Sequence, residues 1–187
     1  MRIGVYCGSF APVHLGHIGI VRQALKEKAA DMVIIVPSSD YWNKKVAIDL
    51  DTRIKCLKVY ESENIIIDED PEDLEAPYTY VLMERLLKKY PDDELCLMLG
   101  ADNLTKFKDW KNSQYLLDNY PFIVMNRDDL NCEELLKQLN KEDYFLLHCD
   151  NFDISSTFIR ENLDNYELIR DMVDKEVVDI LLNSAAF

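Results

Sequence analysis

The sequence has no apolar run long enough to cross a membrane. Its longest apolar runs, such as Met32–Val36 and Leu95–Leu99, have the length of a β-strand, whereas a membrane-spanning helix needs about 20 apolar residues. The apolar start of the chain breaks at Gly8, which is too early for a secretory signal peptide. We therefore expect neither a membrane partner nor export.

Paired cysteines and an excess of basic side chains are missing as well. The 187 residues include five cysteines but no Cys-x-x-Cys pair, and an odd count argues against a disulfide framework. Thiols of this kind are typical of a reducing compartment, which predicts a cytoplasmic protein. The net charge is −14. Nucleic acid is therefore not an expected partner, since non-specific binding to it depends on Lys and Arg contacts to phosphate. The sequence leaves a homo-oligomer open.

The chain does contain a regular alternation of strand-like and helix-like segments, without a repeat, a low-complexity tract or a Gly/Ser linker. The expected strands are Arg2–Cys7, Met32–Pro37, Asn64–Asp68, Glu94–Leu99, Pro121–Met125 and Tyr144–His148. The expected helices are His17–Lys28, Thr52–Glu61, Tyr78–Lys89, Cys132–Leu139, Phe158–Leu163 and Tyr166–Leu182. Apolar strands separated by helices are typical of a parallel sheet covered on both sides. The sequence therefore predicts one α/β domain over 1–187, a Rossmann-like doubly wound parallel sheet of five or six strands with helices on both faces.

A glycine-flanked loop follows the first expected strand and reads Gly8-Ser-Phe-Ala-Pro-Val-His14-Leu-Gly16-His17. Ligands of such folds lie at the carboxyl ends of the strands, and Gly8 lets a ligand approach the backbone. His14 would lie just before the helix and His17 in its first turn, where free amides and the helix dipole form an anion site. Both imidazoles can donate to phosphate oxygens. The alternatives are a zinc pair, for which no third Cys or His is nearby, and an ordinary loop histidine.

A second candidate phosphate-binding segment, Asp153-Ile-Ser155-Ser156-Thr157-Phe-Ile-Arg160, lies near the C-terminus. Ser and Thr at a helix start cap free amides, and their hydroxyls can also face a phosphate. Arg160 follows Ser156 by four residues, so both side chains project from one helix face, and a guanidinium matches phosphate oxygens. The alternative is a plain N-cap with a solvated arginine.

Two more segments follow expected strands and carry candidate substrate contacts. Gly100-Ala-Asp102 directly follows the fourth strand, where a carboxylate can accept hydrogen bonds from ribose hydroxyls or cap the next helix. Trp110 can stack on a heteroaromatic ring or belong to the core. After the second strand, Lys44-Lys45 and Arg53 can attract a substrate phosphate, although exposed lysines are also ordinary surface.

These motifs, in this order, resemble the nicotinate/nicotinamide mononucleotide adenylyltransferases, a branch of the H-x-G-H nucleotidylyltransferase superfamily. Gly8–His17 matches G-x-F-x-P-x-H-x-G-H, and Ile154–Arg160 matches I-S-S-T-x-I-R. Gly100–Leu104 with Trp110 is similar to G-A-D-x-L…W, and Tyr78-Thr79 to the S-Y-T element beside the pyridine pocket.

Two segments depart from the pattern of the family's bacterial members. Asp40–Lys45 replaces P-P-H-K and is closer to the eukaryotic D-A-Y-K-K, and Arg127-Asp-Asp stands where R-P-G is usual. Because these positions bear on mononucleotide selection, the choice between nicotinate and nicotinamide stays open.

The resemblance implies transfer of the adenylyl group of ATP to a pyridine mononucleotide in NAD biosynthesis, with release of pyrophosphate. Mg²⁺ would accompany ATP, and no protein metal ligand is expected. A C-terminal helical segment of about 155–187 would carry the I-S-S-T-x-I-R motif. The implied catalytic residues are His14, His17 and Arg160. The implied ATP-binding residues are Gly8, Ser9, Phe10, Gly16, Ser155, Ser156 and Thr157. The implied mononucleotide-binding residues are Lys45, Arg53, Thr79, Gly100, Asp102 and Trp110.

Two other functions are compatible with parts of the sequence. Phosphopantetheine adenylyltransferase shares the fold and the ATP chemistry but typically has T-x-G-H in the first loop, so His14 counts against it. A nucleotide-binding regulatory module without turnover is the alternative from another class, and the intact His14, His17 and Arg160 disfavour it.

Overall fold

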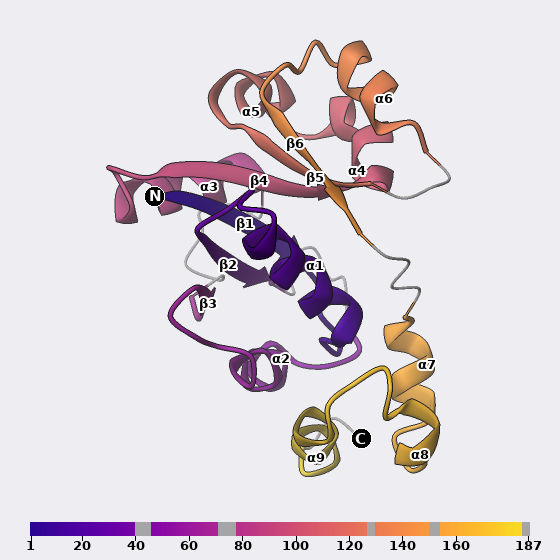
Figure 1. The fold of residues 1–187 in the computed structure, drawn as a ribbon. Coiled ribbons are helices and arrows are strands. Elements are labelled where there is room, and N and C mark those ends of the chain that lie inside the picture. Colours follow the sequence, from indigo (N-terminus) through magenta and orange to yellow (C-terminus); the bar gives the residue numbers. More distant parts are fainter. Residues whose placement is uncertain (40–45, 71–77, 127–129, 150–153, 185–187) are drawn as a thin grey trace.

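Six parallel strands form one sheet in the order β3-β2-β1-β4-β5-β6 (Figure 1). This is a computed structural model, and it describes residues 1–39, 46–70, 78–126, 130–149 and 154–184. The strands are β1 Arg2–Gly8, β2 Met32–Pro37, β3 Ile65–Ile67, β4 Glu94–Gly100, β5 Phe122–Asn126 and β6 Tyr144–His148. The predicted parallel α/β sheet is confirmed.

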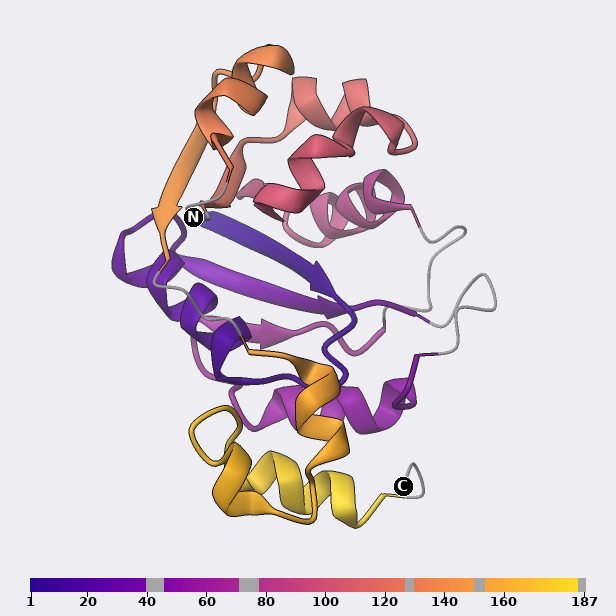
Figure 2. The ribbon, with the colours of Figure 1, turned by 90° about the vertical axis from the view of Figure 1, so that its right-hand side faces the viewer.

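Helices cover both faces of the sheet, as predicted, because side chains alternate between the faces along each strand. In β1, Ile3 and Val5 pack on one face and Tyr6 on the other. The α1 face is covered by α1 Leu15–Lys26, α2 Leu50–Lys58, α7 Ser156–Glu161, α8 Tyr166–Ile169 and α9 Lys175–Leu182. The α3 face is covered by α3 Thr79–Lys89, α4 Ala101–Thr105, the 3-10 helix η2 Phe107–Asp109, α5 Ser113–Asn119 and α6 Cys132–Gln138. Figure 2 shows the two layers on either side of the strands.

The direction of winding reverses between β1 and β4. From β1 the chain adds β2 and β3 on one side, then returns to pair β4 with β1 and continues outward to β5 and β6. The last paired residues of the two central strands are Tyr6 and Met98, and Gly8 and Gly100 end these strands two residues later. This reversal is the position where doubly wound sheets bind ligands.

The C-terminal part of the chain departs from the predicted elements. A single helix over Tyr166–Leu182 is wrong, because α8 ends at Ile169 and α9 begins at Lys175. The carbonyl of Met172 accepts a hydrogen bond from the Leu15 amide at 2.9 Å, so the break in the helix links this segment to the start of α1. In the described part of the chain, no helix has the length and hydropathy that a membrane span requires.

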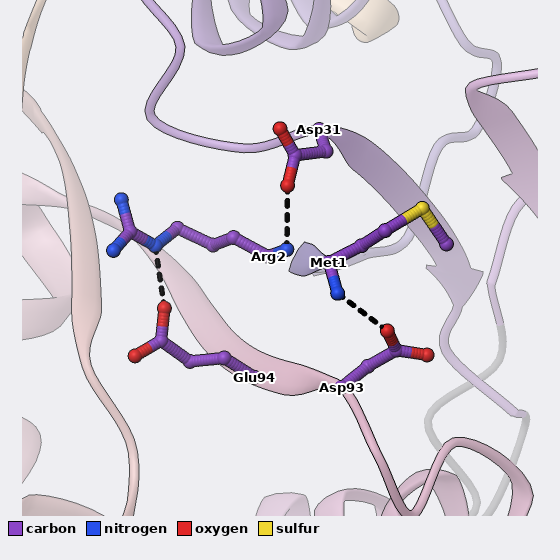
Figure 3. Close-up of polar contacts among 5 residues, drawn as sticks. All are labelled: Met1, Arg2, Asp31, Asp93 and Glu94. Carbon is purple, nitrogen blue, oxygen red and sulfur yellow. Dashed lines mark hydrogen bonds and ion pairs between the residues drawn. The ribbon is translucent and has the colours of Figure 1, made fainter.

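The amino ends of β1 and β4 are joined by a small polar cluster (Figure 3). The Met1 ammonium donates to Asp93 at 2.7 Å, and the Arg2 amide donates to Asp31 at 2.7 Å. The Arg2 guanidinium pairs with Glu94 at 2.6 Å. The hydrogen bond to Asp93 raises the pKa of the terminal amine. The cluster lies at the amino ends of these strands, opposite to the carboxyl ends where Gly8 and Gly100 lie. Exposed pairs of this kind stabilise a fold only weakly.

Candidate active site

Two histidines form the start of α1. His14 is the N-cap residue, and its Nδ1 accepts the His17 amide at 3.3 Å, while Nδ1 of His17 accepts the His14 amide at 3.3 Å. The two rings stack with centroids 3.6 Å apart and an interplanar angle of 20°. Because each Nδ1 accepts an N–H, the proton of each neutral ring lies on Nε2. The pair thus offers two Nε2–H donors, on nearly parallel rings, at the amino end of a helix.

Burial keeps both histidines neutral at pH 7. His14 is only 6% exposed, and burial lowers its pKa to about 4. Burial, and secondarily the neighbouring His14, lowers the pKa of His17 to about 3. Phe10 is 1% exposed, and its ring packs edge-on against that of His17, with the ring centroids 5.0 Å apart. Phe10 therefore supports His17 with its side chain.

Helix α7 lies beside the loop that follows β1 (Figure 2). Ser155 caps α7 by accepting the Phe158 amide at 3.3 Å, as its position predicts. Ser156 donates to the carbonyl of Pro12 at 3.0 Å, and Arg160 donates to the carbonyl of Ala11. Their partners are adjacent residues, so the prediction that Ser156 and Arg160 share a helix face is confirmed. The fold thus unites two motifs that lie more than 140 residues apart.

Arg160 has a second contact on its own helix. Its guanidinium donates to the Thr157 hydroxyl at 3.1 Å, and Thr157 and Ser155 are both exposed. Arg160 therefore holds the I-S-S-T-x-I-R segment and the first loop together. Anionic oxygens bind a guanidinium more strongly than neutral carbonyls do, so a phosphate arriving here can compete for the same N–H groups.

Arg53, a predicted phosphate contact, lies in the interior of the protein. Its exposed fraction is 0%, and its guanidinium donates to the carbonyls of Ser9, Ser38 and Ile48 at 2.9, 2.8 and 2.9 Å. The Ser38 amide also donates to the carbonyl of Gly8 at 2.7 Å. Arg53 thus links the loops after β1 and β2 from the interior. Ser38 has no sequence signal, because only its backbone takes part.

The two strand-end glycines have different surroundings. A Cβ on Gly8 would lie 3.0 Å from the Phe10 ring, so a larger residue there would have to displace this ring by a few tenths of an ångström. A Cβ on Gly100 would meet no atom of the described residues within 4 Å, and the backbone of Gly100 is extended with φ −75°. Neither conformation nor packing within the described chain requires glycine at position 100. This position leaves space for a ligand.

The remaining predicted residues are divided between the α3 face, the start of α1 and the part of the chain outside the described residues. Asp102 is exposed in the first turn of α4, whose N-cap is Gly100, so Asp102 is not the cap residue. Trp110 is half-buried, with its ring 5.0 Å from that of Phe107. Thr79 begins α3 and is half-buried. Lys45 lies outside the described residues. Gly16 is buried in the first turn of α1. Within the described ranges, no group of three or more His, Cys, Asp or Glu could hold a metal ion.

Known proteins similar to this chain share both its sequence pattern and its fold. Residues 5–162 match the family model described as cytidylyltransferase-like. Probable nicotinate-nucleotide adenylyltransferases of Fusobacterium nucleatum and Clostridium novyi are 34% and 33% identical, and the alignments cover 97% and 92% of both chains.

Two solved structures resemble the whole chain. Plasmodium falciparum nicotinic acid mononucleotide adenylyltransferase complexed with NaAD has a TM-score of 0.77 at 20% identity, covering 97% of this chain and 94% of that one. A putative nicotinate-nucleotide adenylyltransferase from Vibrio parahaemolyticus has a TM-score of 0.70 at 21% identity, covering 97% of this chain and 99% of that one. At these identities the likeness concerns the fold.

Proposed function

The chain belongs to the cytidylyltransferase-like family, and within it to the nicotinate-nucleotide adenylyltransferases, and we propose that it joins ATP to nicotinate mononucleotide. The products are the dinucleotide and pyrophosphate. The observation that carries the proposal is the stacked His14–His17 pair at the amino end of α1, with α7 of the I-S-S-T-x-I-R motif hydrogen-bonded to the same loop. The names of the curated relatives support nicotinate as the acceptor.

The reaction is an in-line displacement at the α-phosphorus of ATP. An oxygen of the mononucleotide 5′-phosphate forms the new P–O bond, and the bond from the α-phosphorus to its bridging oxygen breaks, so that pyrophosphate leaves with the electron pair. The attacking phosphate is already anionic and needs no strong general base. The protein therefore acts by positioning the two substrates and by stabilising the charge that develops on the phosphate oxygens.

His14 and His17 supply two neutral Nε2–H donors to these oxygens. Neutral donors can stabilise the triphosphate and the leaving pyrophosphate without holding a proton that must be released afterwards. The hydroxyls of Ser155 and Thr157, together with Arg160, bind the β- and γ-phosphates. Arg160 exchanges the neutral carbonyl of Ala11 for an anionic oxygen as ATP enters.

The acceptor lies across the reversal of the sheet, above Gly100. In the proposal, Asp102 accepts hydrogen bonds from a ribose, and Thr79 and Trp110 contact the pyridine side. The exposed position of Asp102 and the open space above Gly100 support this arrangement.

Mg²⁺ would accompany ATP as its complex and would supply charge neutralisation at the phosphate oxygens. The side chains assigned to the triphosphate, His14, His17 and Arg160, offer N–H donors, which suit phosphate oxygens and not a cation. We assign the metal ligands to ATP and water. We place the protein in a reducing, cytoplasmic compartment. The five cysteines support this, because all of them are thiols.

Pyrophosphate release tests the proposed function. Purified protein is incubated with ATP and Mg²⁺ plus nicotinate mononucleotide, nicotinamide mononucleotide or phosphopantetheine in separate reactions. We expect release with nicotinate mononucleotide, and the expected dinucleotide identified by mass spectrometry. Release with phosphopantetheine alone would identify the other adenylyltransferase, and ATP binding without release in any reaction would identify a regulatory module.

A further inference from the structure

Arg53 stands out among the charged side chains because it is completely buried. Burying a charged side chain is costly unless its hydrogen bonds are replaced inside the protein. The contacts given above supply that replacement, since Nε donates to Ile48 and Nη1 to both Ser9 and Ser38. These carbonyls come from the loop after β1, the end of β2 and the segment before α2. One planar side chain therefore connects three segments that lie up to 44 residues from it in sequence.

The linked segments are the ones on which the proposed reaction depends. The loop after β1 leads from Ser9 to the His14–His17 pair, and the segment after Ser38 leads toward Lys45, a predicted mononucleotide contact. The Ser38 amide bonds to the carbonyl of Gly8 at 2.7 Å, so the two loops are joined twice within a few residues. Their spacing is held from the interior, because Arg53 is completely buried.

We propose that Arg53 is a positioning residue, and not a ligand of the substrate phosphate: its guanidinium sets the spacing between the loop that binds ATP and the loop that receives the mononucleotide. The inference rests on the proposed function. In-line transfer requires the attacking oxygen to lie close to the α-phosphorus and opposite the leaving group, and small displacements cost rate steeply. Loss of the link should therefore slow the chemical step more than it weakens the binding of either substrate.

The guanidinium also turns the carbonyls of Ser9 and Ser38 toward the interior. Carbonyl oxygens that face a phosphate repel it, whereas amides attract it. Arg53 donates to these two carbonyls, Arg160 donates to the carbonyl of Ala11, and Ser156 donates to that of Pro12. Four carbonyls near the carboxyl ends of the strands thus have donors within the protein. Among these donor side chains, Arg53 is completely buried. Its role therefore differs from that of Arg160, whose N–H groups a phosphate can reach.

Arg53→Lys and Arg53→Gln test the proposal, with Lys55→Met as the matched control on the same helix. Lysine keeps the positive charge but lacks the planar fork that reaches several carbonyls at once. Lys55 pairs with Asp51 at 2.9 Å, and its side chain is 63% exposed. Thermal unfolding sets a temperature at which each variant is folded. At that temperature kcat and the KM for each substrate are measured, and amide exchange at Ser38 is followed by NMR.

For both Arg53 variants we expect kcat to fall about 100-fold, the KM for each substrate to change less than about fivefold, and Ser38 to exchange faster than in the Lys55→Met control. A raised KM for the mononucleotide with unchanged kcat would make Arg53 a ligand and overturn the proposal. Wild-type kcat in either variant would overturn it too. If neither variant folds, Arg53 is required for folding, and the positioning role is rejected.

The outcomes separate this proposal from the proposed function. If the wild-type protein releases no pyrophosphate with any mononucleotide, the proposed function fails. Exchange at Ser38 would still report whether Arg53 links the two loops. If the wild type turns over and Arg53→Lys matches it, the proposed function stands and the positioning role fails.

Discussion

The stacked histidines should make the stability of this protein depend strongly on pH between 6.5 and 4. In the unfolded chain each has an ordinary pKa of about 6.5, whereas burial lowers the folded values to about 4 for His14 and about 3 for His17. As the pH falls below 6.5, the unfolded chain binds protons that the folded chain does not, so acid favours unfolding. The stability associated with the neutral pair is fully present above pH 6.5 and is lost as the pH falls through this window.

The size of the effect follows from proton linkage. Each histidine that is protonated only in the unfolded state contributes about 1.4 kcal/mol per pH unit to the slope. Both together lower the free energy of unfolding by roughly 2 kcal/mol between pH 6 and pH 5, allowing for incomplete protonation of the unfolded chain at pH 6. This figure is the change in the free energy of unfolding between the two pH values, not the total free energy of unfolding.

Urea unfolding at pH 6 and pH 5 measures this difference. His14→Gln and His17→Gln should each remove about half of it, because each leaves one buried histidine. Carboxylates also titrate near pH 5, but they are common to all variants and cancel in the comparison. His148, whose side chain is 88% exposed, provides the control, and His148→Gln should follow the wild type. The same pH dependence in the wild type and both glutamine variants would refute the assignment of the effect to the pair.

Four further substitutions test the site and its boundaries. His17→Ala should lower kcat by roughly 10²–10³-fold while the circular dichroism spectrum is kept, as for loss of one charge-stabilising donor; wild-type turnover would remove His17 from the mechanism. Arg160→Ala should chiefly raise the KM for ATP, and an unchanged KM would contradict phosphate binding by Arg160. Gly100→Ala should change the free energy of unfolding by less than about 0.5 kcal/mol. It should nevertheless raise the KM for a substrate about tenfold, because the added methyl group crowds the ligand. Wild-type kinetics would show that no ligand approaches Gly100. Arg2→Met, at the opposite edge of the sheet, should cost less than about 1 kcal/mol in urea unfolding and leave kcat unchanged, whereas reduced kcat would link that cluster to the site.

Local sequence was informative where a single segment carries all of the signal. The apolar runs of β1, β2 and β4 predicted buried parallel strands, and the His14-x-Gly16-His17 spacing placed both imidazoles at the start of a helix. The short helices α4, α5 and η2 had no such signal, because segments of three to seven residues are too short to show a hydrophobic period. The apolar pattern over Tyr166–Leu182 does not show the division into two helices, and the segment between them contacts the start of α1 through Met172 and Leu15.

The class of fold and the chemistry of the phosphate-binding groups follow from local sequence, since apolar periodicity and the types of side chain in a loop are local properties. How these groups are held is visible only in the folded protein. The tertiary structure assigned both His Nδ1 atoms to backbone amides, brought α7 against the loop after β1, and buried Arg53 between two loops. The placement of α7 and of Arg53 depends on hydrogen bonds to backbone groups far away in sequence. The histidine contacts span only three residues, but they require the backbone geometry of the helix start. A backbone carbonyl or amide is present at nearly every residue, so nothing in the residue type of Pro12, Ser38 or Met172 indicates which of them will be used.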